Sequence, residues 1–381
     1  VEALASPERE LLDEGAGHAR PRGELAQGGD VDLHVEVAGV ADDSPVLHRR
    51  EVLAVDDVDV SGQRDEQLPS RAAAAIGVAK PRLLVYDHAL QLEGGGQKYA
   101  ARMANALRDR LKPSYLTHLK PPDGIWKLHG VRPFPLRTIR APRRMGRTQI
   151  DPGIAQVLPQ NPFEAVSRAS ADVPFLLNAN MVVGLEPRAD LSLFLCHFPD
   201  QPPTPPFHVR EYDRLICNSR YTRGWIRRRW NLDPHALLYP PVDMEAPRCP
   251  KEKLILSVAR LESSGSKKQV EMLLAFAQLR APGWRLVLAG GTVPGEDRYL
   301  NNLNRLRALL LLSRPDLPVE ILPDPPARRI RDLYARATLF WHLCGLGETD
   351  PVRVEHFGRS VAEAMQNGAV PLVFDGGGMR E

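Results

Sequence analysis

The chain has 381 residues, with 50 Lys and Arg against 47 Asp and Glu, and four cysteines. This length predicts two domains, and cysteines without paired spacing argue against a disulfide framework or a structural zinc site and favour a reducing cytoplasm. No apolar run approaches the roughly 20 residues that a membrane-spanning helix needs.

Residues 1–78 differ from the rest of the chain in composition. They hold 17 acidic and 7 basic residues, a net charge of −10, which leaves +13 on residues 79–381 for the total of +3. Every aromatic residue lies at or after Tyr86. We therefore expect 1–78 to be a poorly ordered acidic extension, or a translated upstream region outside the working protein. The basic balance of 79–381 permits acidic partners such as nucleotide phosphates, anionic lipid or nucleic acid.

The first structured unit begins near residue 82. Residues 83–86 form an apolar run typical of a buried strand, 93–96 form a glycine loop, and 97–110 have helical spacing. Strands are also predicted at 191–196, 215–218 and 236–239, with a helix at 221–230 that Ser219 could cap. The Arg-rich stretch 132–147 is best interpreted as a solvated loop, and 243–253 as a linker between domains.

The second half alternates strands with helices. The predicted strands are 254–259, 285–289, 319–322, 339–342 and 370–374, and the predicted helices are 269–279, 300–312, 327–337 and 358–366. This order indicates an α/β fold with parallel sheets covered on both faces. We expect two Rossmann-like lobes that face each other across a cleft, with ligands at the carboxyl ends of the strands.

The strongest chemical pattern is a pair of glutamates, Glu355 and Glu363, at a predicted loop-to-helix junction. The amides of Phe357, Gly358 and Arg359 would begin the helix, where unpaired N–H groups and the helix dipole attract a phosphate. Carboxylates beside such an anion site can accept hydrogen bonds from sugar hydroxyls. By spacing alone, two surface glutamates on a helix would be the more common explanation.

The segment GLGETDPVRVEHFGRSVAEAMQNGAVPLVFDGGGMRE at 345–381 resembles the signature of retaining GT-B glycosyltransferases of the family 4 type, the glycosyl transferases group 1. The resemblance covers roughly residues 81–381. It extends to SVARLESSGSKKQVEMLLAFAQL (257–279), LVLAGG (286–291), NSRYTRGWI (218–226), YPPVD (239–243), CHFP (196–199) and GGGQKYAARMANAL (94–107). CHFP, YPPVD and EHFG are similar to the branch that includes mannosyltransferases of lipid-linked oligosaccharide assembly.

The resemblance implies roles for residues of the second lobe. Glu363 would bind the nucleotide ribose, and Glu355 would contact donor sugar hydroxyls and stabilise the transition state. Arg260 and Lys267, with Lys268 as the alternate, would clamp the diphosphate. Fixed positive groups stabilise the negative charge that builds on the leaving oxygen. The loop 262–266 is longer than is usual in the family, which leaves the choice between the two lysines open.

In the first lobe, Gly95 and Gly96 match the family loop that approaches the donor phosphates and the acceptor. Glycine suits this position because the backbone can come close without a Cβ clash, although a plain turn explains a glycine triplet equally well. His197 matches a histidine near the reacting sugar. A lone histidine is more often structural, but its place at the carboxyl end of a strand favours function.

The resemblance also implies the organisation of the protein and its ligands. Residues 79–243 would be the acceptor-side lobe and 244–381 the nucleotide-sugar-binding lobe, which we expect to be incomplete because the family continues beyond the glycine loop before Glu381. We expect no metal and no cofactor besides the sugar nucleotide, since Arg260 and Lys267 would neutralise the diphosphate. The Asp-x-Asp pairs at 30–32 and 57–59 are then chance matches in an acidic stretch.

The predicted activity is transfer of a sugar from a nucleoside diphosphate sugar to a glycan or lipid-linked acceptor, with retention of anomeric configuration. The predicted setting is the cytoplasm, with peripheral membrane contact as an option and without nucleic acid as a partner. Two alternatives stay open: a nucleotide-sugar epimerase of the same fold, and a catalytically inert nucleotide-sugar-binding fragment.

Overall fold

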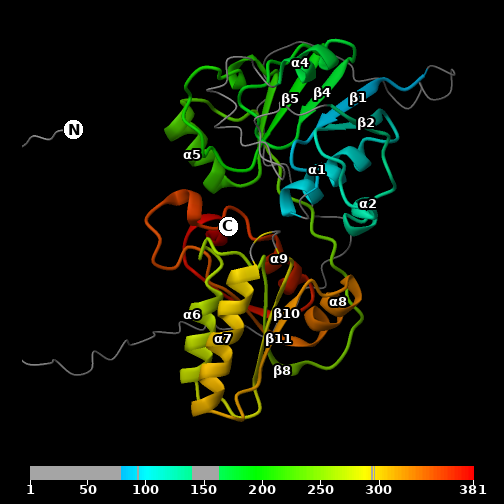
Figure 1. Cartoon of the computed structure of the whole chain (residues 1–381). Helices are drawn as coiled ribbons and strands as arrows, with labels where there is room; N and C mark the ends of the chain where they lie inside the picture. The colour runs from blue at the N-terminus through cyan, green and yellow to red at the C-terminus, as the bar shows by residue number, and fades with distance from the viewer. Residues whose placement is uncertain (1–78, 92–93, 140–162, 293–294, 296) are drawn as a thin grey trace, which may run out of the picture. The chain divides into compact units, whose positions relative to one another are not determined.

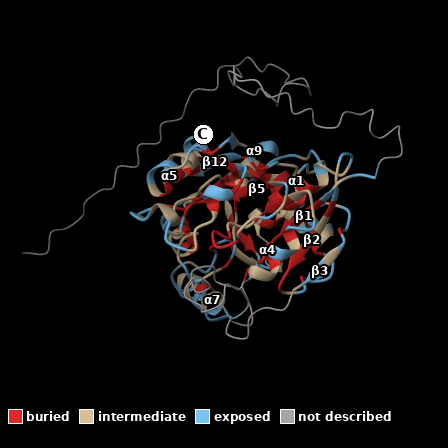
Figure 2. Ribbon diagram, turned by 90° about the horizontal axis from the view of Figure 1, so that it is seen from above, coloured by how far each residue is buried: buried red, intermediate tan, exposed pale blue. Residues whose placement is uncertain are grey.

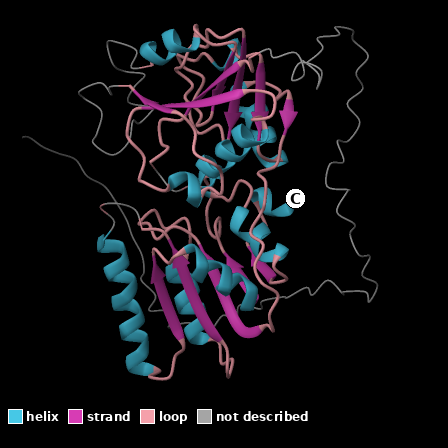
Figure 3. Cartoon of the chain, turned by 90° about the vertical axis from the view of Figure 1, so that its right-hand side faces the viewer, coloured by secondary structure: helices cyan, strands magenta, loops and turns pink. Residues whose placement is uncertain are grey.

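Two parallel β-sheets with flanking helices form the framework of the protein (Figure 1 and Figure 3). The computed structural model describes residues 79–91, 94–139, 163–292, 295 and 297–381, all within one compact unit, Gln67–Glu381. The expectations for 1–78, including both Asp-x-Asp pairs, and for the basic residues 140–147 lie outside the described residues. The predicted lobe boundary at 243/244 stays a prediction; it falls between the two sheets in sequence.

The first sheet has seven strands in the order β3-β2-β1-β4-β5-β6-β7, with every neighbouring pair parallel. The strands are β1 Arg82–Tyr86, β2 Lys112–Thr117, β3 Leu136–Thr138, β4 Phe175–Asn178, β5 Leu191–Cys196, β6 Arg214–Cys217 and β7 Ala236–Leu237. The helices are α1 Gly95–Ala106, α2 Ile125–Leu128, α4 Glu164–Ser170 and α5 Arg220–Trp230, with a 3-10 turn at Val209–Glu211.

The second sheet has five parallel strands in the order β10-β9-β8-β11-β12. The strands are β8 Glu252–Val258, β9 Arg285–Gly290, β10 Val319–Pro323, β11 Ala337–His342 and β12 Val370–Val373. The helices are α6 Gln269–Gln278, α7 Asp297–Ser313, α8 Ala327–Arg336 and α9 Arg359–Gln366, with 3-10 turns at Pro351–Arg353 and Gly377–Arg380.

Alternate residues of the central strands pack into separate cores on the two faces of each sheet (Figure 2). In β1, Tyr86 packs into the cluster that holds Trp230, whereas Val85 packs into the cluster that holds Tyr99. In β8, Leu254 and Ile255 separate in the same way. Burial on both faces explains why these strands are continuous apolar runs in the sequence.

The predicted α/β architecture is confirmed, and the differences have local causes. The strands β2, β3 and β4 were not predicted; β2 begins with the polar and proline-containing segment Lys112–Pro113–Ser114. The predicted linker 243–253 is wrong at its end, because β8 begins at Glu252, whose carboxylate pairs with Arg285 and Arg336 at 2.8 Å each. The predicted cap is confirmed: the Ser219 hydroxyl accepts a hydrogen bond from the Thr222 amide.

The strand order determines where a ligand can bind. The chain reverses direction across each sheet between β1 and β4 and between β8 and β11, and crevices open at such switch points beyond the carboxyl ends of the strands. In the second sheet the residues at this point are Arg260, just after β8, and His342, the last residue of β11. Among the described helices, none has the length and apolar character needed to cross a bilayer.

Candidate active site

A cavity of about 1010 Å³ lies where the carboxyl ends of both sheets contribute loops. It is lined by every residue that the sequence nominated except Lys268: Gly95, Gly96, His197, Arg260, Lys267, Glu355, Phe357, Gly358, Arg359 and Glu363. Other lining residues include Lys98, Asn180, His342 and His356, which the sequence did not nominate. The cavity volume is sufficient for a ligand of nucleotide-sugar size.

The two candidate lysines diverge because their backbones differ. Lys268 caps α6 with a φ of 58°, in the left-handed region, and its Nζ lies 2.6 Å from Glu348 Oε1. Lys267 instead places its Nζ 3.3 Å from Glu355 Oε2. The structure therefore brings Lys267 to the cavity and holds Lys268 in a separate ion pair. Arg260 also reaches the cavity and pairs with Glu262 at 3.4 Å.

The Glu355 carboxylate is held by three donors. Its Oε1 accepts a hydrogen bond from the Gly358 amide at 3.2 Å, and its Oε2 lies 3.0 Å from His342 Nε2 and 3.3 Å from Lys267 Nζ. Burial raises the pKa of Glu355, but Lys267 and His342 outweigh burial and hold it well below its ordinary value. In turn, Glu355 raises the pKa of Lys267. Both groups are therefore charged at neutral pH.

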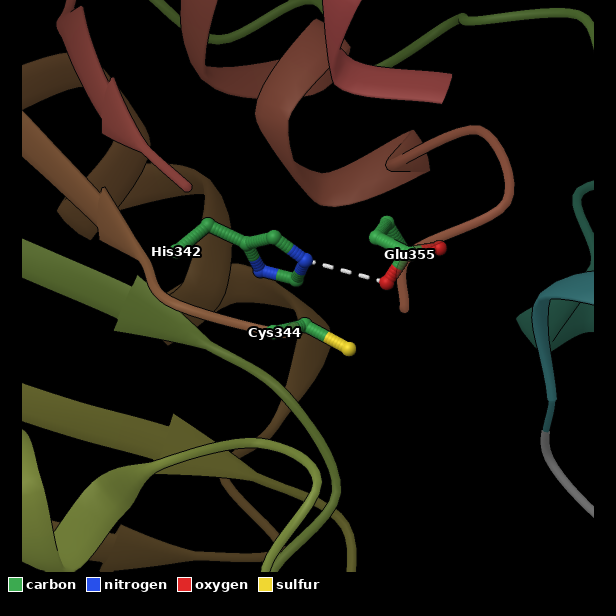
Figure 4. A group of neighbouring side chains, drawn as sticks. All are labelled: His342, Cys344 and Glu355. Atoms are coloured by element: carbon green, nitrogen blue, oxygen red, sulfur yellow. Dashed lines mark hydrogen bonds and ion pairs between the residues drawn. The ribbon is translucent and has the colours of Figure 1, made fainter. Parts of the chain in front are cut away.

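The arrangement of His342, Cys344 and Glu355 also tests for a metal site (Figure 4). Their ligand atoms lie within 4.8 Å of one another, a mixed set that could suit Zn²⁺. However, the Lys267 ammonium lies 3.8 Å from Cys344 Sγ as well as against Glu355, so a cation is already supplied by the chain. Burial raises the pKa of Cys344 to about 11, which keeps it a thiol. The donor set fits a lysine-filled cluster better than a metal site.

Glu363 projects from α9 and is also held by three donors. Its Oε1 lies 3.5 Å from Lys98 Nζ and 3.2 Å from Arg359 Nη2, and its Oε2 accepts a hydrogen bond from the Tyr334 hydroxyl at 3.2 Å. Burial raises the pKa of Tyr334, so its hydroxyl stays a donor. A ribose that bound Glu363 would take the place of the long, weak Lys98 contact.

His197 faces the glycine loop at the start of α1. Its Nε2 lies 3.1 Å from the Ala179 carbonyl oxygen, which can only accept, so Nε2 carries a proton. Burial lowers the pKa of His197 to about 4, and the ring is therefore neutral at pH 7. A Cβ at Gly96 would lie 3.1 Å from this nitrogen, and one at Gly95 would lie 3.2 Å from Arg359 Cδ. Glycine thus permits the close approach here.

The predicted anion site at the start of α9 is partly used within the protein. Gly358 precedes α9 with a φ of 82°, and its amide is directed to Glu355 rather than into open space. This left-handed backbone conformation explains why glycine stands there. Sequence reasoning missed Lys98 and His342, although His342 ends a strand beside β8, the kind of position where ligand-binding residues gather.

Comparison with known proteins agrees with this geometry. The family described as Glycosyl transferases group 1 matches residues 243–381, whereas no curated protein matches the sequence. Alr3699/HepE of Anabaena, solved with UDP and glucose, is similar in fold with a TM-score of 0.57 and 17% identity over 79% of this chain and 82% of that one.

Two further solved glycosyltransferases have similar folds. One, from Rickettsia africae ESF-5, has a TM-score of 0.54 and 13% identity over 78% of this chain and 80% of that one. The other, WaaG, involved in lipopolysaccharide biosynthesis, has a TM-score of 0.52 and 14% identity over 78% and 82%. The described residues therefore adopt the GT-B fold, with a glycosyl transferases group 1 domain over residues 243–381.

Proposed function

We propose that this protein transfers a sugar from a nucleoside diphosphate sugar to a glycan or lipid-linked acceptor, with retention of anomeric configuration. The observation that carries the proposal is the charged pair of Glu355 and Lys267 on the cavity wall, with Arg260 beside it. The fold neighbour Alr3699/HepE, solved with UDP and glucose, supports a nucleotide-sugar donor. The proposed setting is the cytoplasm, with peripheral membrane contact where the acceptor is lipid-linked.

The proposed chemistry assigns each charge a task. As the bond to the leaving phosphate breaks, positive charge develops on the sugar and negative charge on the phosphate oxygen. The Glu355 carboxylate would stabilise the oxocarbenium-like sugar, and Lys267 and Arg260 would stabilise the leaving diphosphate. Neutral His197 would hydrogen-bond the sugar, because it is uncharged at pH 7. Retention is proposed from the family resemblance, and the anomeric signal of the product would test it.

Binding of the donor is testable by calorimetry with UDP-glucose, GDP-mannose and ADP-glucose. We expect one of the three to bind, and the Glu363→Ala variant to bind it about tenfold more weakly, since a hydrogen bond to a charged group is lost. Glu320→Ala is the matched control, because Glu320 forms ion pairs with Arg285 and Arg329 and does not line the cavity. Absence of binding to all three sugars would refute the proposal.

Two alternatives predict different outcomes of the same experiment. A nucleotide-sugar epimerase would change the free sugar nucleotide without an acceptor. An inert binding module would bind the nucleotide sugar but would release no nucleotide when acceptors are added. The ion-paired state of Glu355 favours the transferase, because a carboxylate held ionised suits stabilisation of positive charge better than proton transfer.

We expect transfer to continue in EDTA, with kcat changed by less than about twofold. The reason is that Arg260 and Lys267 lie on the cavity wall and can neutralise a diphosphate. The measurement is initial rate with and without chelator, followed by addition of Mg²⁺ or Mn²⁺. Loss of activity in EDTA and its restoration by a divalent ion would contradict metal-independent transfer.

A further inference from the structure

His342 is fixed at the centre of the second sheet. It is the last residue of β11, which pairs with β8 on one side and β12 on the other. The residue is 3% exposed, yet it lines the cavity. Its Nε2 lies 3.0 Å from Glu355 Oε2 (Figure 4). An ionised carboxylate oxygen only accepts, so this imidazole nitrogen is the donor.

The donors around Glu355 differ in rigidity. Lys267 reaches the carboxylate through four methylene groups, and the proposed diphosphate would compete with Glu355 for its ammonium. An imidazole on a central strand has only two side-chain torsions and cannot follow the phosphate. The Gly358 amide holds the other oxygen, Oε1, at 3.2 Å. When Lys267 turns to the donor, His342 is thus the side chain left to orient Oε2.

We propose that His342 is a positioning residue for Glu355. It donates its Nε2 proton to Oε2 and keeps the carboxylate directed at the reacting sugar while Lys267 neutralises the leaving diphosphate. His342 itself does not touch the sugar in this scheme. The inference rests on the proposed glycosyl transfer and goes beyond it by assigning a residue outside the paired glutamates.

Two variants separate hydrogen bonding from packing. His342→Leu removes the donor and keeps a similar volume, whereas His342→Gln can place its amide nitrogen near the position of Nε2. For His342→Leu we expect kcat to fall about tenfold to a hundredfold, as for the loss of a hydrogen bond to a charged group. The KM for the donor should stay within about threefold, because the diphosphate and ribose contacts remain.

The pH profile gives a readout that packing alone would not change. Without the His342 donor, the ionised form of Glu355 is less stabilised, so the acid limb of the kcat profile should move to higher pH. His342→Gln should recover kcat to within about threefold of the wild type. Trp341→Phe is the control: its neighbouring side chain packs on the other face of the sheet against Phe276, and kcat should be unchanged.

Equal losses of kcat in the Leu and Gln variants, with an unshifted acid limb, would overturn the positioning role. The nitrogen-15 shifts of the His342 imidazole add a test that needs no activity: the proposal requires the Nε2-protonated tautomer, and an Nδ1-protonated ring would overturn it. Failure of the proposed function has a different signature. In that case the wild type itself would bind none of the three nucleotide sugars, whatever the state of His342.

Discussion

The Glu355→Gln variant is expected to lose about a hundredfold to a thousandfold in kcat while it still binds the donor nucleotide. The substitution keeps the shape of the side chain but removes the negative charge that would face the oxocarbenium-like sugar. In the structure this charge is maintained against burial by Lys267 and His342. The measurement is acceptor-dependent nucleotide release, with binding followed separately by calorimetry.

Glu348→Gln is the matched control for this substitution. Glu348 is buried to a similar degree, 12% exposed against 19% for Glu355, and it also forms an ion pair with a lysine. It does not line the cavity, however. We expect the control to lower stability without lowering kcat. Wild-type turnover by Glu355→Gln would remove Glu355 from the proposed mechanism.

The Lys267→Met variant is expected to lose about 3–5 kcal/mol of stability at pH 7, as when one partner of a buried ion pair is removed. Its activity should also fall, because the leaving diphosphate loses a cation. In the wild type, the lowered pKa of Glu355 contributes stability above the ordinary carboxyl pKa, and this stability is lost as the pH falls through the folded-state pKa.

Removal of Lys267 reverses that pH dependence. Burial then dominates and the folded-state pKa of Glu355 rises, so the cost is greatest at neutral pH and shrinks as the pH falls below about 4. Urea unfolding at pH 4 and pH 7 measures this difference. Lys268→Met should also lose stability, since it pairs with Glu348, but should keep its nucleotide affinity. Equal effects of both lysine variants on affinity would contradict the assignment of Lys267.

The elements predicted from the sequence are those in which one pattern determines the outcome. The strand at 191–196 is found at the same residues, because apolar residues on both faces of a central strand form an unbroken run. The strand β2 was missed because Lys112 and Pro113 interrupt such a run. The helix α1 begins at Gly95, two residues before the prediction, since a glycine-rich start carries no helical periodicity.

The site could be predicted where the family motif names residues, as for Glu355 and Glu363. The choice between Lys267 and Lys268 could not, because it depends on the left-handed backbone conformation of Lys268, which the sequence around it does not specify. Lys98 and His342 were missed for a related reason. Their proximity to the glutamates depends on strand order and helix placement, and neither is encoded by spacing along the chain.

The central position of β11 has a consequence for how the site assembles during folding. The pairing of β8 with β11 joins Ile255 to Leu339, with β9 and β10 and their helices between them in the chain. Contacts of such long sequence separation carry a high loop-closure entropy and form late in folding. The β8–β9 and β9–β10 pairings are more local and can form earlier. Glu355, His342 and Lys267 should therefore come together among the last steps of folding of this domain.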